Sequence, residues 1–217
     1  MIEAVDAYIG LGTPDTGTRE VRYPAFAILA ALWVAWCAYW LISARDVKAA
    51  RRRESFASRA LHIGPMYIAA VLMAVPRLPI GWLNARFVPA TVAIDVLGVI
   101  LVSTGLGFAA WARVHLGRNW SGEITLKQEH ELIRSGPYGL VRHPIYSGML
   151  AAMSGTAIVI GEWRALIALV FFVVAVLRRV SVEQRWLSEI FPDDYSRYRR
   201  EVPALVPFLK GRIANSE

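Results

Sequence analysis

The stretch GPYGLVRHPIYSG, residues 136–148, lies between two apolar segments and decides how the chain is organised. It combines two prolines, three glycines, two tyrosines, an arginine and a histidine. Prolines fix the backbone and remove hydrogen-bond donors, whereas glycines permit conformations and close approaches that other residues forbid. We therefore predict a rigid, bent connector that holds Tyr138, Arg142, His143 and Tyr146 at fixed positions. A tight interhelical turn with incidental polar residues is the simpler interpretation, and it stays open here.

The composition indicates an integral membrane protein of one domain. Of the 217 residues, 56% are apolar, and several long stretches carry no charge. Such runs are typical of chains that cross a bilayer several times. The formal net charge is +7, and the basic residues cluster at the ends of the apolar runs. This distribution indicates membrane-surface anchors rather than a nucleic-acid partner. The single cysteine, Cys37, lies within an apolar run and has no intrachain disulfide partner.

Five apolar runs predict the fold class. They indicate an all-α integral membrane protein with about five transmembrane helices. The last two runs are short and flank a polar turn, so they predict a helical hairpin whose small residues let its two arms approach closely. An amphipathic helix follows on the cytosolic side. The runs span residues 24–43, 60–75, 88–112, 145–160 and 165–177, and the small residues are Gly148, Ala151, Ala152 and Gly155.

The distribution of lysine and arginine predicts the orientation in the membrane. The segments after the first, third and fifth runs hold nineteen of these residues, and the opposite side holds five. Cytoplasmic segments carry the excess of positive charge, so we expect the N-terminus outside and the C-terminus and connector in the cytoplasm. The expected location is a bacterial inner membrane or an equivalent membrane. Residues 1–217 are treated as one domain, with three transmembrane helices in 1–112 and the catalytic half in 113–217.

Three local predictions concern polar groups near the membrane. Asp95 lies inside an apolar run, where a charge is costly, and we expect it to pair with Arg77 or Arg86 rather than to act in catalysis. Residues 122–133 alternate weakly between apolar and polar types, which predicts a short extended or hairpin segment. After the amphipathic helix, Asp193 is expected to cap a second short helix.

The sequence lacks several familiar catalytic motifs. No glycine-rich phosphate loop follows a predicted strand, the four histidines lack metal-ligand spacing, and Ser147 lacks the context of an activated nucleophile. No metal site is therefore expected. What remains is a polar cluster drawn from the connector and the C-terminal helix, with Arg179 and Glu183 one helical turn apart. Its members are His130, Tyr138, Arg142, His143, Tyr146, Arg179 and Glu183. An ordinary surface ion pair between Arg179 and Glu183, and a His143 that merely caps a turn, stay open.

Three segments of the C-terminal half carry a resemblance to a known family. They are LGRNWSGEI (116–124), HELIRSGPYGLVRHPIYSG (130–148) and EQRWLSEIFPDDYSRYRREVPALVPF (183–208). In the order and spacing of these motifs the chain resembles the isoprenylcysteine carboxyl methyltransferase family of integral membrane enzymes. The first two apolar runs carry no signature and simply fit the expected number of helices.

The resemblance implies S-adenosylmethionine as the methyl donor, bound on the cytosolic side beneath the connector and against the C-terminal helix. It implies that Arg179 lies next to the methyl-accepting carboxylate and that Glu183 is the first acid of the family's Glu-Glu pair. Arg142 is a second candidate for holding the carboxylate, because a guanidinium can bind it in a forked contact. The second acid is replaced by Gln184, and Pro192 stands where a glycine is usual. The cofactor contacts implied by the resemblance are Glu123, His130, Glu131, Leu132, Ile133, Tyr138, His143, Pro144, Ile145, Tyr146 and Glu183.

The expected activity is methyl transfer to a lipophilic, membrane-embedded acceptor, namely the carboxylate of an isoprenylcysteine-like or prenylated substrate. A carboxylate is already ionised at neutral pH, so this reaction needs alignment more than a base. Three alternatives stay open: a phospholipid N-methyltransferase, a reductase of the sterol-reductase kind that uses NADPH, and a non-catalytic module that binds membrane lipids.

Overall fold

The computed structural model describes residues 16–43, 55–117 and 132–207, and the regular secondary structure within these ranges is helical apart from one isolated bridge between Arg86 and Glu162. The helices in chain order are α2 (Thr16–Ser43), α3 (Phe56–Ala74), the 3-10 turn η1 (Gly81–Asn84), α4 (Val92–Leu116), α5 (Pro137–Leu140), α6 (Pro144–Ile160), α7 (Trp163–Ile190) and α8 (Pro192–Glu201). The predicted hairpin segment at 122–133 lies almost wholly outside the described residues.

Four helices are long and apolar enough to cross a membrane, which confirms an all-α integral membrane fold. Their apolar spans are Pro24–Ser43, Phe56–Ala74, Val92–Leu116 and Trp163–Ile190. With 17 residues, α6 is shorter than these, so the predicted fifth crossing stays a prediction. The fifth apolar run and the predicted amphipathic helix form one continuous helix, α7, as expected.

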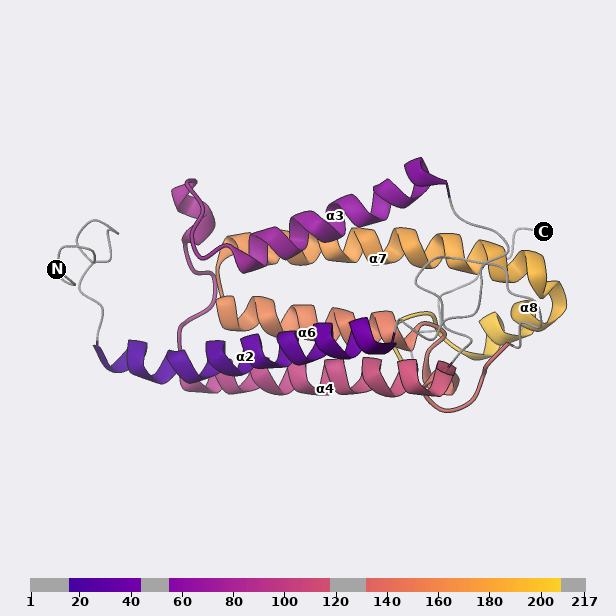
Figure 1. Cartoon of the computed structure of the whole chain (residues 1–217), viewed down its shortest axis with the longest axis horizontal. Coiled ribbons are helices and arrows are strands. Elements are labelled where there is room, and N and C mark those ends of the chain that lie inside the picture. Colours follow the sequence, from indigo (N-terminus) through magenta and orange to yellow (C-terminus); the bar gives the residue numbers. More distant parts are fainter. Residues whose placement is uncertain (1–15, 44–54, 118–131, 208–217) are drawn as a thin grey trace.

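The long helices form two layers. One layer contains α2, α4 and α6, and the other contains α3 packed along α7 (Figure 1). The two layers meet at one end through the polar turn between α6 and α7, where Gly161 adopts the left-handed conformation. Next to this turn, Ala157 and Ile160 of α6 share a buried cluster with Ala165 of α7. At the other end, α7 leads into α8, which lies beyond the ends of both layers (Figure 1).

Glycines bring α4 and α6 into direct backbone contact. A Cβ atom at Gly105 would lie 2.6 Å from the carbonyl oxygen of Gly148, and one at Gly155 would lie 2.5 Å from that of Gly98. The small residues of α6 therefore pack against α4, and the prediction that they join α6 to α7 is wrong. Each helix carries two glycines seven residues apart, so the pairs meet in antiparallel order and the backbones approach closely.

Arginines satisfy backbone carbonyls at the ends of several helices. The last carbonyls of a helix lack partners within the helix, and leaving them bare near a membrane is costly. A guanidinium donates to them from another segment of the chain, and Arg113 also donates to the C-cap residue of its own helix. The contacts run from Arg113 to Ser43 and Gly117, from Arg86 to Ile160, from Arg164 to Leu72 and Val75, and from Arg142 to Arg199 and Val202.

Two local predictions fall at helix starts. Asp95 is buried in the first turn of α4, where the helix dipole favours a negative charge. The Arg86 side chain donates to backbone carbonyls, and its expected ion pair with Asp95 stays a prediction. The expected cap at Asp193 is wrong, because α8 begins one residue earlier with Pro192 and its N-cap is Phe191. Proline suits a first helical position, since its missing N–H has no partner there.

Candidate active site

The connector starts with a tight turn into α5. Gly136 has φ +58°, a backbone conformation that favours glycine, and Pro137 occupies the first position of α5. A Cβ atom at Gly136 would lie 2.8 Å from the His115 ring of α4, so the two segments pack closely here. His115 also lies 2.9 Å from the Ser135 hydroxyl and stacks on Tyr138. The end of α4 therefore fixes the start of the connector.

The C-terminal tail pairs with the far end of the connector through its backbone. The N–H of Arg142 donates to the Pro203 carbonyl at 2.8 Å, and the N–H of His143 donates to the Ala204 carbonyl at 3.0 Å. These bonds resemble a short strand pairing. His143 is the N-cap of α6 and Pro144 is its first helical residue, so the entry into α6 is set by this contact.

Contacts of α8 also hold the connector. Together with the backbone bonds of Pro203 and Ala204, they form what we call the tail clamp. The Tyr198 hydroxyl donates to the Tyr138 carbonyl at 2.6 Å, and Arg134 donates to the Asp194 carbonyl at 2.7 Å. Tyr195 is fully buried beside Arg142, and burial raises the pKa of its phenol to about 12. The paired tyrosines of α8 are thus internal supports for the connector.

Arg142 lies against the C-terminal end of α8 rather than in an open site. Its Nη1 donates to the carbonyls of Arg199 at 3.0 Å and Val202 at 2.8 Å. Partial burial lowers the pKa of Arg142 from its usual value, although an arginine stays charged at neutral pH. The described contacts of Arg142 hold the connector and α8 together.

His143 contacts two neighbouring residues of α7. It is 4% exposed, and its Nε2 lies 3.3 Å from Nε2 of Gln184. The amide nitrogen of glutamine can only donate, so the imidazole Nε2 accepts and the ring proton sits on Nδ1. That Nδ1 faces the Glu183 carboxylate at 3.7 Å, which is a polar contact longer than a hydrogen bond. Burial lowers the pKa of His143, an effect that Glu183 opposes, so the ring is neutral at pH 7.

Arg179 joins three helices one turn before Glu183. Its Nε donates to the Tyr146 hydroxyl of α6 at 2.8 Å, and its Nη1 lies 3.2 Å from Nε2 of His62 on α3. The Tyr146 hydroxyl also interacts with the Glu183 carboxylate. The structure therefore brings Arg179, Tyr146, His143 and Glu183 together, as the sequence predicted.

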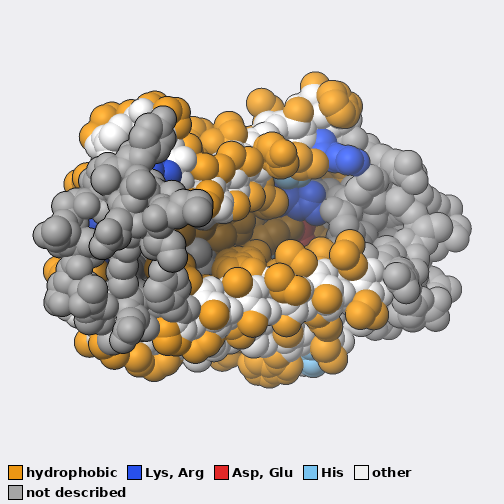
Figure 2. Space-filling model, turned by 60° about the vertical axis from the view of Figure 1, so that its left-hand side comes forward, with side chains coloured by type: hydrophobic (Ala, Val, Ile, Leu, Met, Phe, Trp, Pro, Cys, Tyr) orange, Lys and Arg blue, Asp and Glu red, His pale blue; other side chains and the backbone are white. Residues whose placement is uncertain are grey.

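An apolar hollow opens between the two layers, and basic side chains lie at one end of it (Figure 2). Trp33 of α2 and Met149 of α6 contact the apolar clusters of both layers, which places them where the layers meet. A membrane protein with such a hollow can receive an apolar chain from the bilayer while a polar group stays at the end. Tyr146, which accepts from Arg179, packs against the apolar cluster of the α3 and α7 layer.

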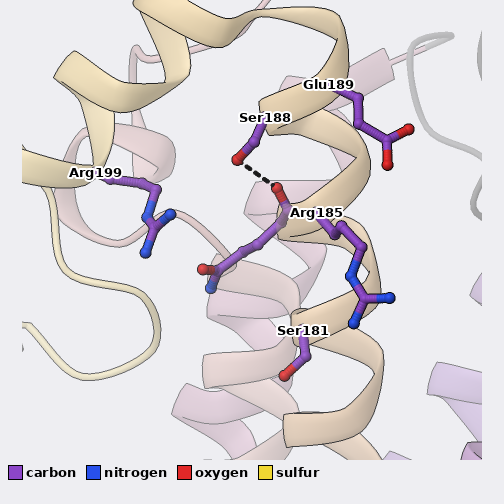
Figure 3. Close-up of a pocket in the computed structure, with 6 residues that line it drawn as sticks. Ser181, Arg185, Ser188, Glu189 and Arg199 are labelled. Carbon is purple, nitrogen blue, oxygen red and sulfur yellow. Dashed lines mark hydrogen bonds between the residues drawn. The ribbon is translucent and has the colours of Figure 1, made fainter. Parts of the chain in front are cut away.

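A second, polar depression lies on the outer side of α7. It is an open pocket of about 520 Å³ between α7 and α8 (Figure 3). In Figure 3, Arg199 reaches from α8 toward the face of α7 that carries Ser181 and Ser188. Gln184 lines the pocket and also contacts His143, so the pocket adjoins the site. The lining residues are Ser181, Gln184, Arg185, Ser188, Glu189 and Arg199.

The remaining predicted residues fall into two groups. Glu123, His130 and Glu131 lie outside the described residues. Leu132 and Ile133 are half-buried at the start of the connector, and Pro144 and Ile145 begin α6 beside His143.

Sequence reasoning missed two members of the site. Gln184 was noted only as a departure from the family pattern, and its place beside Glu183 is the signal that could have linked it to His143. His62 was considered only as a metal ligand. A histidine inside an apolar run is a weak signal, because nothing in the sequence links it to Arg179, which lies 117 residues further on.

Two sequence comparisons show the family of this chain. Residues 94–194 match the family model described as phospholipid methyltransferase. Protein-S-isoprenylcysteine O-methyltransferase B of Arabidopsis thaliana is 31% identical over 149 residues, which cover 66% of this chain and 68% of that protein. The chain belongs to the isoprenylcysteine O-methyltransferase family. It is thus a membrane methyltransferase, and its family implies a methyl donor.

Other relatives are matched over a shorter part of their length. Protein-S-isoprenylcysteine O-methyltransferase of Saccharomyces cerevisiae is 30% identical over 123 residues, covering 55% of this chain and 52% of that protein. A solved structure of a eukaryotic intramembrane Ras methyltransferase, isoprenylcysteine carboxyl methyltransferase, is 22% identical with a TM-score of 0.46. That match covers 71% of this chain and 51% of the other. The chain therefore spans about half the length of these two relatives.

Proposed function

We propose that this chain transfers a methyl group from S-adenosylmethionine to the carboxylate of a lipophilic, membrane-embedded acceptor of the isoprenylcysteine type. The observation that carries the proposal is the meeting of Arg179, Tyr146, His143 and Glu183 where Tyr146 packs against an apolar cluster. The molecule also has an apolar hollow with basic side chains at one end (Figure 2). An acceptor of this type has an apolar tail and an anionic head. The hollow suits the tail, and the Arg179 guanidinium suits the head.

The polar residues fit S-adenosylmethionine in charge and hydrogen bonding. Bound at the site, this donor supplies an electrophilic methyl group on a positively charged sulfur. The Glu183 carboxylate, 36% exposed, offers a negative charge toward such a cation, and the adjoining pocket offers hydroxyl, amide and charged groups for polar ends. The Nδ1 proton of neutral His143 faces the same carboxylate and keeps its orientation. Tyr138, Pro144, Ile145 and Tyr146 would form the wall beneath it, and Leu132 and Ile133 its edge.

Arg179 is the residue that we assign to the acceptor carboxylate. A carboxylate is ionised at neutral pH, so the chain has to bind and align it without removing a proton. Arg142 already donates to two α8 carbonyls, and we assign it to positioning the connector instead. The apolar walls exclude water from the reacting oxygen, which strengthens the electrostatic hold of the guanidinium.

The proposal includes the orientation in the membrane. The helices α2, α4 and α7 run in one direction, and α3 and α6 run back (Figure 1). The connector and α8 then lie at the end that carries the excess of lysine and arginine, which favours the cytoplasmic side. A donor made in the cytosol reaches the site directly on that side.

A phospholipid amine is the second candidate acceptor, because the matching family model is described as phospholipid methyltransferase. A lipid amine is an ammonium ion at neutral pH, which the Arg179 cation repels, and it has to lose a proton before its nitrogen can attack. The carboxylate reading therefore agrees better with the charge at the site.

The test uses the purified full chain with methyl-labelled S-adenosylmethionine. We expect labelling of an S-farnesyl N-acetylcysteine acid and none of phosphatidylethanolamine. Glu183→Ala should abolish donor binding measured by calorimetry, whereas Arg179→Ala should bind the donor and lose most turnover. Arg178→Ala is the matched control, since Arg178 donates to Ser58 of α3 and should leave turnover near that of the wild type.

Other results would redirect the proposal. Labelling of the phospholipid alone would select the amine acceptor. Binding of NADPH in place of the methyl donor would select a reductase. Absence of any donor binding would favour the lipid-binding module.

A further inference from the structure

We infer that His62 is a positioning residue of this site, which holds the Arg179 guanidinium in place for the acceptor carboxylate. The inference rests on the proposed function, because it assigns a support to the residue that binds the acceptor there. It adds α3 to the helices that build the site.

The contacts of His62 indicate which ring nitrogen carries the proton. The ring is 2% exposed, and its Nε2 lies 3.2 Å from Arg179 Nη1. A guanidinium has donors only, so Nε2 accepts and the ring proton sits on Nδ1. In this form the imidazole is neutral, and it holds the arginine without adding a second positive charge beside the expected carboxylate.

Two acceptors on different helices fix the plane of the guanidinium. Tyr146 of α6 accepts from Nε at 2.8 Å, and His62 of α3 accepts from Nη1. An arginine side chain is long and flexible, and ordering it each time a substrate carboxylate binds would cost entropy. Because Tyr146 and His62 hold Arg179 before the substrate arrives, the guanidinium can bind the substrate carboxylate in a forked contact with little reorganisation.

The place of His62 in the chain makes this assignment informative. The matched family region is residues 94–194, and the resembling motifs begin at residue 116. His62 lies before both, in a helix without any motif of the family. The structure thus assigns a role to a part of the chain that the motifs leave without one.

The test replaces His62 and keeps the rest of the α3–α7 contact. His62→Leu removes the acceptor at similar volume, whereas His62→Gln retains an oxygen that can reach Arg179. His62→Asn is one methylene shorter and should behave like the leucine variant. Ser58→Ala is the matched control. Ser58 lies one turn before His62 on α3 and accepts a 2.7 Å hydrogen bond from Arg178, so this substitution removes a similar bond between α3 and α7.

The readout is the affinity for S-farnesyl N-acetylcysteine acid relative to that for its carboxamide, measured by calorimetry without the methyl donor. We expect the wild type to prefer the acid, and His62→Leu and His62→Asn to lower that preference about five- to ten-fold. His62→Gln and Ser58→Ala should keep it. Thermal unfolding in detergent reports whether each variant is folded.

Two outcomes would overturn the inference in distinguishable ways. A folded His62→Leu or His62→Asn that keeps the acid preference of the wild type would show that His62 does not position Arg179. A wild type without any preference for the acid would instead overturn the proposed function, and the inference with it. Should the leucine variant fail to fold, the comparison of His62→Gln with His62→Asn decides.

Discussion

The two sides of α6 are built in opposite ways. Toward α4, glycines on both helices leave no room for a Cβ atom, and the backbones touch at two points one heptad apart. Toward α7, Ala157 and Ile160 share a buried cluster with Ala165 beside the Gly161 turn, and an apolar hollow lies between the two layers (Figure 2). The closed side gives α6 a rigid support, and the open side gives it a surface on which a ligand can lie. Separate faces of one helix therefore provide rigidity and ligand access.

The largest expected effect comes from forcing the closed side apart. In Gly105→Ala the new Cβ atom would lie 2.6 Å from the Gly148 carbonyl oxygen and 2.7 Å from the Ala152 nitrogen, so the helices have to separate. We expect a loss of about 3 kcal/mol or more in stability, seen as a lower unfolding temperature in detergent. Gly107→Ala is the control on the same helix, because nothing lies within 4 Å of its Cβ position. Equal behaviour of the two variants would remove the argument for a closed side.

A smaller effect is expected where the tail supports the open side. Tyr198→Phe removes the hydroxyl that donates to the Tyr138 carbonyl and leaves that buried oxygen without this bond. We expect a loss of about 1–2 kcal/mol in stability and a weaker affinity for the methyl donor, because the connector is less well held. Calorimetric titration and thermal unfolding check both effects. Tyr39→Phe is a comparison variant outside the clamp, and it should change neither.

The protonation of His143 should make the folding stability depend on pH. Burial lowers the pKa of His143 in the folded protein, while the unfolded chain keeps the ordinary value near 6.5. Below pH 6.5 the unfolded state therefore binds the proton first, and stability falls as the pH falls. We expect the unfolding temperature to drop between pH 7 and pH 5, and His143→Gln to reduce that slope. An identical slope in the variant would show that His143 does not titrate in this way.

The smallest effect is expected at the hydrogen bond that joins α2 to α6. Trp33 donates its indole N–H to the Thr156 hydroxyl at 3.0 Å. Hydrogen bonds between helices in membranes contribute about 0.6 kcal/mol on average, so the coupling in a double-mutant cycle should be of that size. The cycle uses Trp33→Phe, Thr156→Val and the double variant, with unfolding measured in detergent. Strictly additive single effects would mean that this bond adds no coupling.

The sequence predicted the helices well because each rests on a local signal. Uninterrupted apolar runs located the long helices, and the prolines and glycines of residues 136–148 predicted a stiff connector. The predicted meeting of the connector with α7 also follows from the motifs of the family. These features depend on neighbours in sequence, and the chain alone therefore indicates them.

The remaining features depend on partners far apart in sequence. The glycines of α6 were assigned to α7, because spacing shows that a face is small but not which helix packs on it. The tail clamp uses the backbone carbonyls of Pro203 and Ala204, which side-chain patterns do not encode. The link from His62 to Arg179 needs the packing of α3 on α7, which no local signal predicts.

The most direct test of the account is photolabelling with an S-prenyl N-acetylcysteine acid whose prenyl end carries a diazirine. The account predicts labels on residues where the two layers meet, such as Trp33, Met149 and Leu150, and predicts that the unmodified acid suppresses them. It also predicts that Arg179→Ala weakens this suppression. Labels that are not suppressed, or that gather on exposed α4 residues such as Val96 and Ile100, would contradict the claim that the hollow and Arg179 form one site.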